Sequence, residues 1–222
     1  KKIDFLKKSK FGNVTFFNSN INNWKIKFLN ENDSLYPGSD RENLTGCLNF
    51  YDSKLNQIEL YLFNSNCEDS VNFVRTKGII KHIEIKDSSF DSLDSDFSQL
   101  TFTSILVNNS KNDCLDFSYG VYKIINANLK NCDDKAISAG ELASLEVNNL
   151  KILNAETGVA SKDYAKVKIK NSKIYNSKIC YDVYKKKQEF AGGYIETNEA
   201  SCFNSKKIYS SDNVSKIIFN KI

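Results

Sequence analysis

Apolar and polar residues alternate in short runs along most of the chain. In segments 81–86 and 166–170, isoleucine or valine alternates with lysine, histidine or glutamate. A period of two residues is typical of β-strands with one buried face, whereas an amphipathic helix needs apolar residues three and four positions apart over longer runs. The pattern therefore predicts an all-β protein made of many short strands.

The short strands recur with a period of about 22 residues, which is the range of solenoid repeats. Three columns of positions follow this period: an apolar column, an asparagine-rich column two residues later, and a third, mainly polar column. All three share a one-residue insertion between their fourth and fifth regular members, which independent coincidences would not do. The columns are Phe63, Ile85, Val107, Leu129, Ile152 and Ile174; Ser65, Asp87, Asn109, Asn131, Asn154 and Asn176; and Asn72, Asp94, Asp116, Ser138 and Ser161.

A coil of this length holds three short strands and three turns, and each strand can pair in parallel with the next coil about 4.8 Å away. Apolar columns then fill the interior, and the asparagine column is expected at a turn with its amides turned inward and bonded to one another. We therefore predict a single right-handed parallel β-helix domain over residues 1–222. Its expected parts are a cap and first coil (1–45), regular coils (46–195) and a C-terminal coil or cap (196–222).

The repeated segments resemble the right-handed β-helix proteins of the pectin-lyase-like class over about residues 45–195. More narrowly, seven phrases resemble a β-helix module of bacterial surface proteins that can accompany spore-coat-kinase-like domains. The resemblance implies architecture and little chemistry, because no activity is established for that module. The phrases are 46–50, 68–75, 94–98, 113–118, 133–141, 158–163 and 184–190.

Composition and charge mainly argue against particular classes of function. The formal net charge of +4 is too small to indicate nucleic-acid binding. No apolar run approaches the roughly 18 residues that span a bilayer, so membrane insertion is not expected. The chain begins at Lys1 without a methionine, and we expect it to be a mature product or part of a larger polypeptide or assembly.

Polar residues concentrate on one segment of each coil. If Leu93, Leu115 and Ile137 point inward, strand parity turns the neighbouring positions to the outer surface. The result is a polar stripe along one face that is acidic first and contains lysines towards its C-terminal end. The stripe comprises Asp94, Asp96, Asp116, Lys135 and Lys162.

Three interpretations of this polar stripe stay open. Aspartates in columns often accept hydrogen bonds from turn backbone, which is a purely structural role. The stripe can instead bind a polysaccharide, or it can be catalytic. In a lyase, Asp94, Asp96 and Asp116 would hold Ca²⁺ and Lys135 or Lys162 would take the proton. In a glycoside hydrolase, Asp94 and Asp116 would be the carboxylate pair.

Further glycan-binding candidates lie near the C-terminal end of the repeats. Tyr181 and Tyr184, followed by Lys185, are candidates for stacking on a sugar. Lys166 and Lys168 alternate on one strand and would face outward, with the charge spacing that a linear acidic polymer could follow.

Six cysteines are present, and Cys180 and Cys202 are one period apart. Stacked positions about 4.8 Å apart suit a disulfide, so this pair is predicted to be bonded. The other four cysteines do not fall in matching columns. The absence of a Cys-x-x-Cys motif argues against zinc, and the even count favours an extracellular setting.

These observations lead us to expect an extracellular or cell-surface β-helix module that displays a polar face for binding polysaccharide, with an acidic polymer favoured. One alternative is a polysaccharide lyase or glycoside hydrolase that acts on a uronate-containing polymer. The other is a purely structural rod of a surface appendage or phage tail fibre.

Overall fold

The computed structural model describes residues 1–8, 12–31 and 44–221. Within those ranges the chain forms strands joined by turns and loops, and no described helix could cross a membrane. The strands are β1 (Lys2–Lys7), β2 (Val14–Phe17), β3 (Asn20–Asn22), β4 (Lys25–Asn30), β5 (Gly46–Tyr51), β6 (Lys54–Ser65), β7 (Asp69–Val74), β8 (Lys77–Ser88), β9 (Asp91–Asp96), β10 (Gln99–Ser110), β11 (Leu115–Ser118), β12 (Val121–Gly140), β13 (Ser144–Lys162), β14 (Lys166–Tyr184), β15 (Tyr194–Phe203), β16 (Lys207–Ser211) and β17 (Lys216–Phe219).

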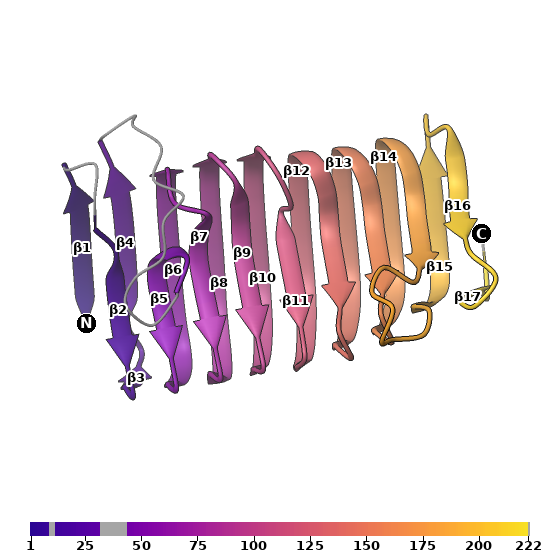
Figure 1. Ribbon diagram of the computed structural model, residues 1–222. Helices are drawn as coiled ribbons and strands as arrows, with labels where there is room; N and C mark the ends of the chain where they lie inside the picture. Colours follow the sequence, from indigo (N-terminus) through magenta and orange to yellow (C-terminus); the bar gives the residue numbers. More distant parts are fainter. Residues whose placement is uncertain (9–11, 32–43, 222) are drawn as a thin grey trace.

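Every strand pairs in parallel with the equivalent strand of the next coil, and the coils stack into an elongated body (Figure 1). The protein is an all-β parallel β-solenoid of about nine turns with about 22 residues per turn, as the repeat predicts.

Each turn of the solenoid crosses three faces. Face A contains β2, β5, β7, β9, β11, β16 and the last parts of β12, β13 and β14. Face B contains β3, β17 and the first parts of β6, β8, β10 and β12 to β15. Face C contains β1, β4 and the strand segments that follow face B in each coil.

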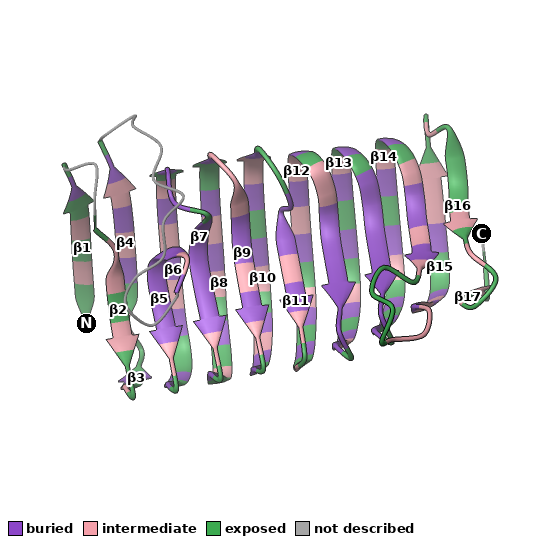
Figure 2. Ribbon diagram, viewed as in Figure 1, coloured by how far each residue is buried: buried purple, intermediate pink, exposed green. Residues whose placement is uncertain are grey.

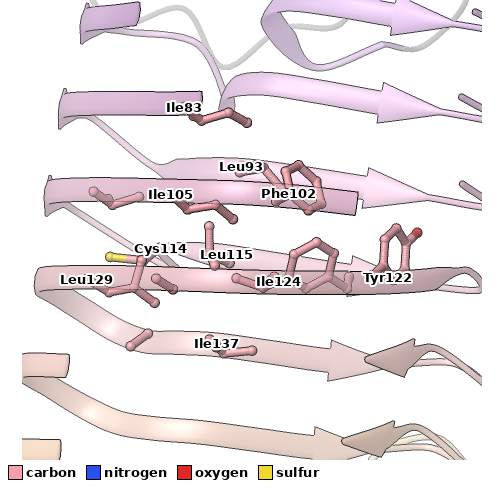
Figure 3. Packing of buried hydrophobic residues seen from close by; sticks show 14 of the residues in the cluster. Ile83, Leu93, Phe102, Ile105, Cys114, Leu115, Tyr122, Ile124, Leu129 and Ile137 are labelled. Carbon is pink, nitrogen blue, oxygen red and sulfur yellow. The ribbon is translucent and has the colours of Figure 1, made fainter. Parts of the chain in front are cut away.

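The predicted interior column is confirmed from Ile85 onward. Strand pairing places Ile85, Val107, Leu129, Ile152 and Ile174 directly over one another, and all five are buried. Figure 3 shows Leu129 among the apolar side chains that fill the interior, and Figure 2 shows the buried and exposed residues alternating along the strands.

The prediction that Phe63 is the first member of that column was wrong. Leu62, and not Phe63, pairs with Ile85, because the register between β6 and β8 shifts near Ile58. The same shift moves Ser65 out of the asparagine column and puts Asn64 there. Farther along the chain, Ser138 pairs with Ala160 instead of Ser161, because the register of β12 and β13 shifts after Cys132.

The asparagine column forms a ladder at the corner between faces C and A. Nδ2 of Asn131 donates to Oδ1 of Asn109 at 2.8 Å, and the same bond links Asn154 to Asn131 and Asn176 to Asn154 at 2.8 and 3.0 Å. These residues have positive φ, a conformation that asparagine tolerates well. The amides lie on the outside of the corner, so the prediction that they turn inward was wrong.

Three disulfides join neighbouring coils: Cys47–Cys67, Cys114–Cys132 and Cys180–Cys202. The predicted pair Cys180–Cys202 is therefore confirmed, although Cys202 stacks on Ile174 and reaches Cys180 across the interior. The three bonds leave no free cysteine in the described chain and indicate an oxidising environment such as that of secreted proteins.

Candidate functional site

The polar stripe lies on face A in two adjacent columns. In the first column Asp94 pairs with Asp116 and Asp116 with Ser138. In the second, Asp96 pairs with Ser118, Ser118 with Gly140, and Gly140 lies one coil before Lys162. The stripe is therefore continuous on one face across four coils, as strand parity predicts.

A row of carboxylates beside the stripe has a structural role. Oδ1 of Asp91 accepts a hydrogen bond from the backbone N–H of Asp113 at 2.7 Å, and Oδ1 of Asp113 accepts one from Lys135 at 2.8 Å. Each carboxylate thus holds the backbone of the next coil at the corner between faces C and A. Burial and repulsion from Asp113 raise the pKa of Asp91 to about 8. Burial also raises the pKa of Asp113, to about 6, although the positive charge of Lys135 opposes this rise.

The aspartates of the stripe itself are not held by turn backbone. Oδ2 of Asp94 accepts a bond from Nδ2 of Asn72 at 2.8 Å, and Asn72 also donates to Asp69 at 3.2 Å. Oδ1 of Asp116 is buried and has no hydrogen-bond partner among the described residues. The structural interpretation therefore accounts for Asp91 and Asp113 but leaves Asp94, Asp96 and Asp116 available for another role.

Burial and crowding make Asp69, Asp94 and Asp96 weak acids. Burial, followed by repulsion from Asp69, Asp96 and Asp116, raises the pKa of Asp94 well above its usual value. Burial also raises the pKa of Asp69 to about 7 and that of Asp96 to about 6. Near neutral pH the floor of face A can therefore both donate and accept protons.

The raised pKa of Asp94 predicts a pH-dependent effect of Asp94→Asn. The folded state holds the Asp94 proton more tightly than the unfolded chain does, so this group stabilises folding below about pH 4. That stabilisation is lost as pH rises through the folded pKa. Asparagine mimics the protonated form, so at pH 8 the variant should be about 1–2 kcal/mol more stable than wild type, and near pH 4.5 about equal.

Thermal melts at the two pH values test this expectation. Asp52→Asn is the matched control, because Asp52 pairs with Arg75 at 2.8 Å on an exposed corner. The control should lower or leave unchanged the melting temperature at pH 8. An Asp94→Asn variant that melts below wild type at pH 8 would show that the carboxylate is stabilised where it lies.

The lysines of the stripe are engaged, which corrects the expectation that they face solvent. Nζ of Lys135 lies 3.5 Å from Oδ1 of Asp113 and also pairs with Asp134. Burial alone would lower the pKa of Lys135, but these carboxylates raise it. Lys162 is only 5% exposed; its stem lies over Gly140 and Nζ donates to Ser138 at 2.8 Å. The absence of a side chain at Gly140 leaves the space that the stem of Lys162 fills, and this packing buries the lysine.

An insertion between β14 and β15 folds back towards face A (Figure 1). Oδ1 of Asp163 accepts the backbone N–H groups of Lys186 and Lys187 at 2.7 and 2.8 Å. Nζ of Lys187 reaches Glu141 at 2.6 Å, and Glu141 also accepts a bond from Ser118 at 2.6 Å. Burial alone would raise the pKa of Glu141, but these two donors lower it. The insertion therefore bounds the stripe at its C-terminal end.

Aromatic side chains form a ridge along the corner between faces A and B, directly beside Asp96. The rings of Phe97 and Tyr119 stack with centroids 4.6 Å apart, and Phe190 of the insertion lies 6.4 Å from both Tyr119 and Tyr164. Phe97, Tyr119 and Tyr164 are 54%, 38% and 49% exposed. We call Phe97, Tyr119, Tyr164 and Phe190 the aromatic ridge. The ridge and the carboxyl groups beside it form one continuous strip of surface. We call the strip between the ridge and the column of Asp94 and Asp116 the face A site.

The remaining predicted site residues are dispersed. Tyr181 is fully buried and its hydroxyl lies 2.7 Å from Ser172, so its assignment as a sugar-stacking residue was wrong. It occupies the inward phase of β14. Tyr184 is half-buried on face A, and Lys185 is exposed beside it. Lys166 and Lys168 are exposed on face B, where Lys168 lies 4.0 Å from Glu196.

A metal site is not preformed within the described ranges. No three carboxylate, imidazole or thiolate side chains there are grouped closely enough to hold an ion. Ca²⁺ binding by Asp94, Asp96 and Asp116 stays a prediction. The crowding of their carboxyl groups is the feature that a cation would relieve.

Four functional candidates were missed in the sequence. Phe97, Tyr119 and Tyr164 belong to a column with the same period and the same one-residue insertion as the others, in which Leu142 is the member between the two tyrosines, so the ridge was detectable. Glu141 sits at the one-residue insertion of the repeat, which also marks a departure from the regular coil.

Comparison with models of protein families finds no match, and comparison with curated proteins finds none either. The function of the face A site therefore has to be argued from its own geometry and chemistry.

Proposed function

We propose that this solenoid is an exported module that binds a polysaccharide on the face A site, between the aromatic ridge and the column of Asp94 and Asp116. The observation that carries this proposal is the exposed ridge itself. It presents stacked rings to solvent beside carboxyl groups that do not hold turn backbone, one of which, Asp116, has an oxygen without a hydrogen-bond partner among the described residues. Sugar rings need this combination, because their apolar faces pack on aromatic rings while their hydroxyl groups bond to polar side chains.

The backbone beneath the ridge supports a functional role. Phe97, Tyr119 and Tyr164 all have positive φ, between 49° and 65°. This conformation costs a bulky residue about 1–2 kcal/mol. At the corner between faces C and A, the same coils place asparagine at the position with positive φ, and asparagine adopts this conformation readily. Aromatic residues at the ridge are therefore a poor choice for stability and a good one for contact with a ligand.

The charge of the face A site suggests which sugars it accepts. Asp69, Asp94, Asp96 and Asp116 outnumber the lysines that are free to approach a ligand, since Lys135 and Lys162 are engaged. A polyanion would be repelled from this floor unless a cation bridged it. Neutral polysaccharides, or polymers of amino sugars, are the ligands that we propose for the face A site.

The test is the double variant Phe97→Asn/Tyr119→Asn. Asparagine relieves the strained backbone, so stability should be unchanged or slightly raised, whereas loss of two stacking rings should weaken binding about 10- to 30-fold. Binding can be measured on an array of chitin-, chitosan-, cellulose- and mannan-derived oligosaccharides. Val121→Asn, which changes an exposed apolar residue on face B, is the control. Equal binding by the double variant and wild type would refute the role of the ridge.

A glycoside hydrolase is the second candidate function. Asp94 and Asp116 pair on adjacent strands, about 4.8 Å apart, and the raised pKa of Asp94 suits a proton donor next to a second carboxylate. Hydrolysis would then be lost in Asp94→Asn while binding at the ridge remained. Release of reducing ends from a bound polymer separates this function from binding alone.

We further propose that the solenoid winds right-handed and is related to the pectin-lyase-like proteins. Parallel crossover connections are right-handed in nearly all known cases, and the repeat length supports the kinship. The three disulfides support export, and display at the cell surface is the setting in which a long glycan-binding face is most useful.

A further inference from the structure

Two hollows on face C join into one groove that follows the axis of the solenoid. The larger has a volume of about 280 Å³ and extends over β10, β12, β13, β14 and β15. The smaller, of about 220 Å³, extends over β8, β10 and β12. Leu106 and Asn128 line both, so the two hollows are continuous across six coils. We call them the axial groove.

The groove lies where each strand bends from face B to face C. Its floor is made by Ala127, Leu150 and Ser172, which point inward at the bend. Amide side chains line one wall, where Nδ2 of Asn149 donates to Oδ1 of Asn126 at 3.0 Å. Amides and a narrow apolar floor suit a flexible chain that carries hydroxyl groups.

Three lysines of the groove lining make no ion pair with a described residue, namely Lys130, Lys151 and Lys173. One carboxylate, that of Glu199, also belongs to the lining, at the C-terminal end of the groove. Lys151 and Lys173 pair on adjacent strands, about 4.8 Å apart. Lys86 also lines the groove and pairs with Glu84 at 2.5 Å. The free positive charges therefore recur along the axis.

One polar atom in the groove lacks a partner. Oδ1 of Asn128 is buried and accepts no hydrogen bond from the described residues, although Asn128 lines both hollows. An acceptor withdrawn from water without a donor costs about 1–3 kcal/mol. A ligand hydroxyl that reached this atom would remove that cost.

We propose that the axial groove binds an anionic polysaccharide, with its acidic groups on Lys130, Lys151 and Lys173 and a hydroxyl group on Asn128. The groove combines free cations with a hydroxyl acceptor, and such a polymer carries both complementary groups. Single-stranded nucleic acid fits less well, because no aromatic side chain lines the groove for base stacking. The axial groove is separate from the face A site and does not depend on the function proposed there.

The test compares polymers that share one backbone. Dextran sulfate and carboxymethyl-dextran should bind at low salt, and uncharged dextran should not. Lys151→Gln/Lys173→Gln should weaken binding at least about fivefold, and raising the salt to 0.5 M should abolish most of it. Lys54→Gln/Lys77→Gln removes the same charge from two exposed lysines that pair on adjacent strands of face B, and it is the matched control. Asn128→Asp should also weaken binding, because it brings an anion to the ligand.

Three results would overturn the proposal. Equal losses in the two lysine variants would show that net charge alone attracts the polymer. Tighter binding of a single-stranded oligonucleotide than of dextran sulfate, at matched charge, would assign the groove to nucleic acid. Binding of uncharged dextran at the same affinity would remove the role of the lysines. Phe97→Asn/Tyr119→Asn should leave binding of the anionic polymers unchanged, so failure of one site is distinguishable from failure of the other.

Discussion

Replacing Leu129 with aspartate is expected to unfold the middle of the solenoid. Leu129 is fully buried between Val107 and Ile152, within the apolar interior shown in Figure 3. An unpaired carboxylate there must remain charged in an apolar interior or take up a proton, and either choice costs several kcal/mol. Because domains are stable by only about 5–15 kcal/mol, one such substitution can remove most of the stability.

Circular dichroism and urea unfolding measure this loss, and hydrogen exchange shows how far it spreads. Coils in a solenoid contact only their neighbours, so the nearest strands β10 and β13 should lose protection first. Lys130→Asp, at the next position on the outer side of the same strand, is the control and should keep the native spectrum. A Leu129→Asp protein with native stability would mean that this column does not face the interior.

The architecture was predictable because a solenoid repeats the same physical requirement in every coil. Each interior position must be apolar, so the column from Ile85 to Ile174 stands out without knowledge of the structure. The error at Phe63 has a local cause. Leu62 and Phe63 are both apolar, so the alternation can be read in either phase, and only the register of β6 against β8 decides between them.

The face A site was only half predictable. Strand parity located Asp94 and Asp116 on one outer face, because it depends on backbone geometry alone. Burial of Lys162 depends on its packing over Gly140, which the repeat does not encode. The positive φ of Phe97 and Tyr119 was equally hidden, because aromatic residues do not signal that conformation in a sequence.

The disulfides Cys47–Cys67 and Cys114–Cys132 were not predicted, for a related reason. Columns reveal which residues stack, whereas Cys114 and Cys132 belong to different columns and meet across the corner between faces C and A. Two coils earlier, Ser70 and Ser88 occupy the equivalent positions, and their hydroxyl groups lie 2.7 Å apart. The same corner is therefore closed by a covalent bond in one coil and by a hydrogen bond in another.

This equivalence gives the last prediction, for the pair Cys114 and Cys132. Their bond closes a loop with a sequence separation of 18 residues, and such a cross-link stabilises a protein by about 3 kcal/mol. Cys114→Ala/Cys132→Ala should therefore lower the melting temperature by roughly 6–12 °C for a chain of this size. Cys114→Ser/Cys132→Ser should lose about 1 kcal/mol less, because it restores the hydroxyl pair that Ser70 and Ser88 make.

Thermal melts of both variants, with the other two disulfides verified by mass mapping, test the comparison. Wild-type protein in which only this bond has been reduced should melt close to the serine variant, since both lack the cross-link and keep polar groups at the corner. If the serine variant instead melts below the alanine variant, the corner is closed by apolar packing and the resemblance to the Ser70–Ser88 pair has no energetic meaning. If wild-type protein purified without reductant carries free thiols at Cys114 and Cys132, the inference of an oxidising environment loses one of its three supports.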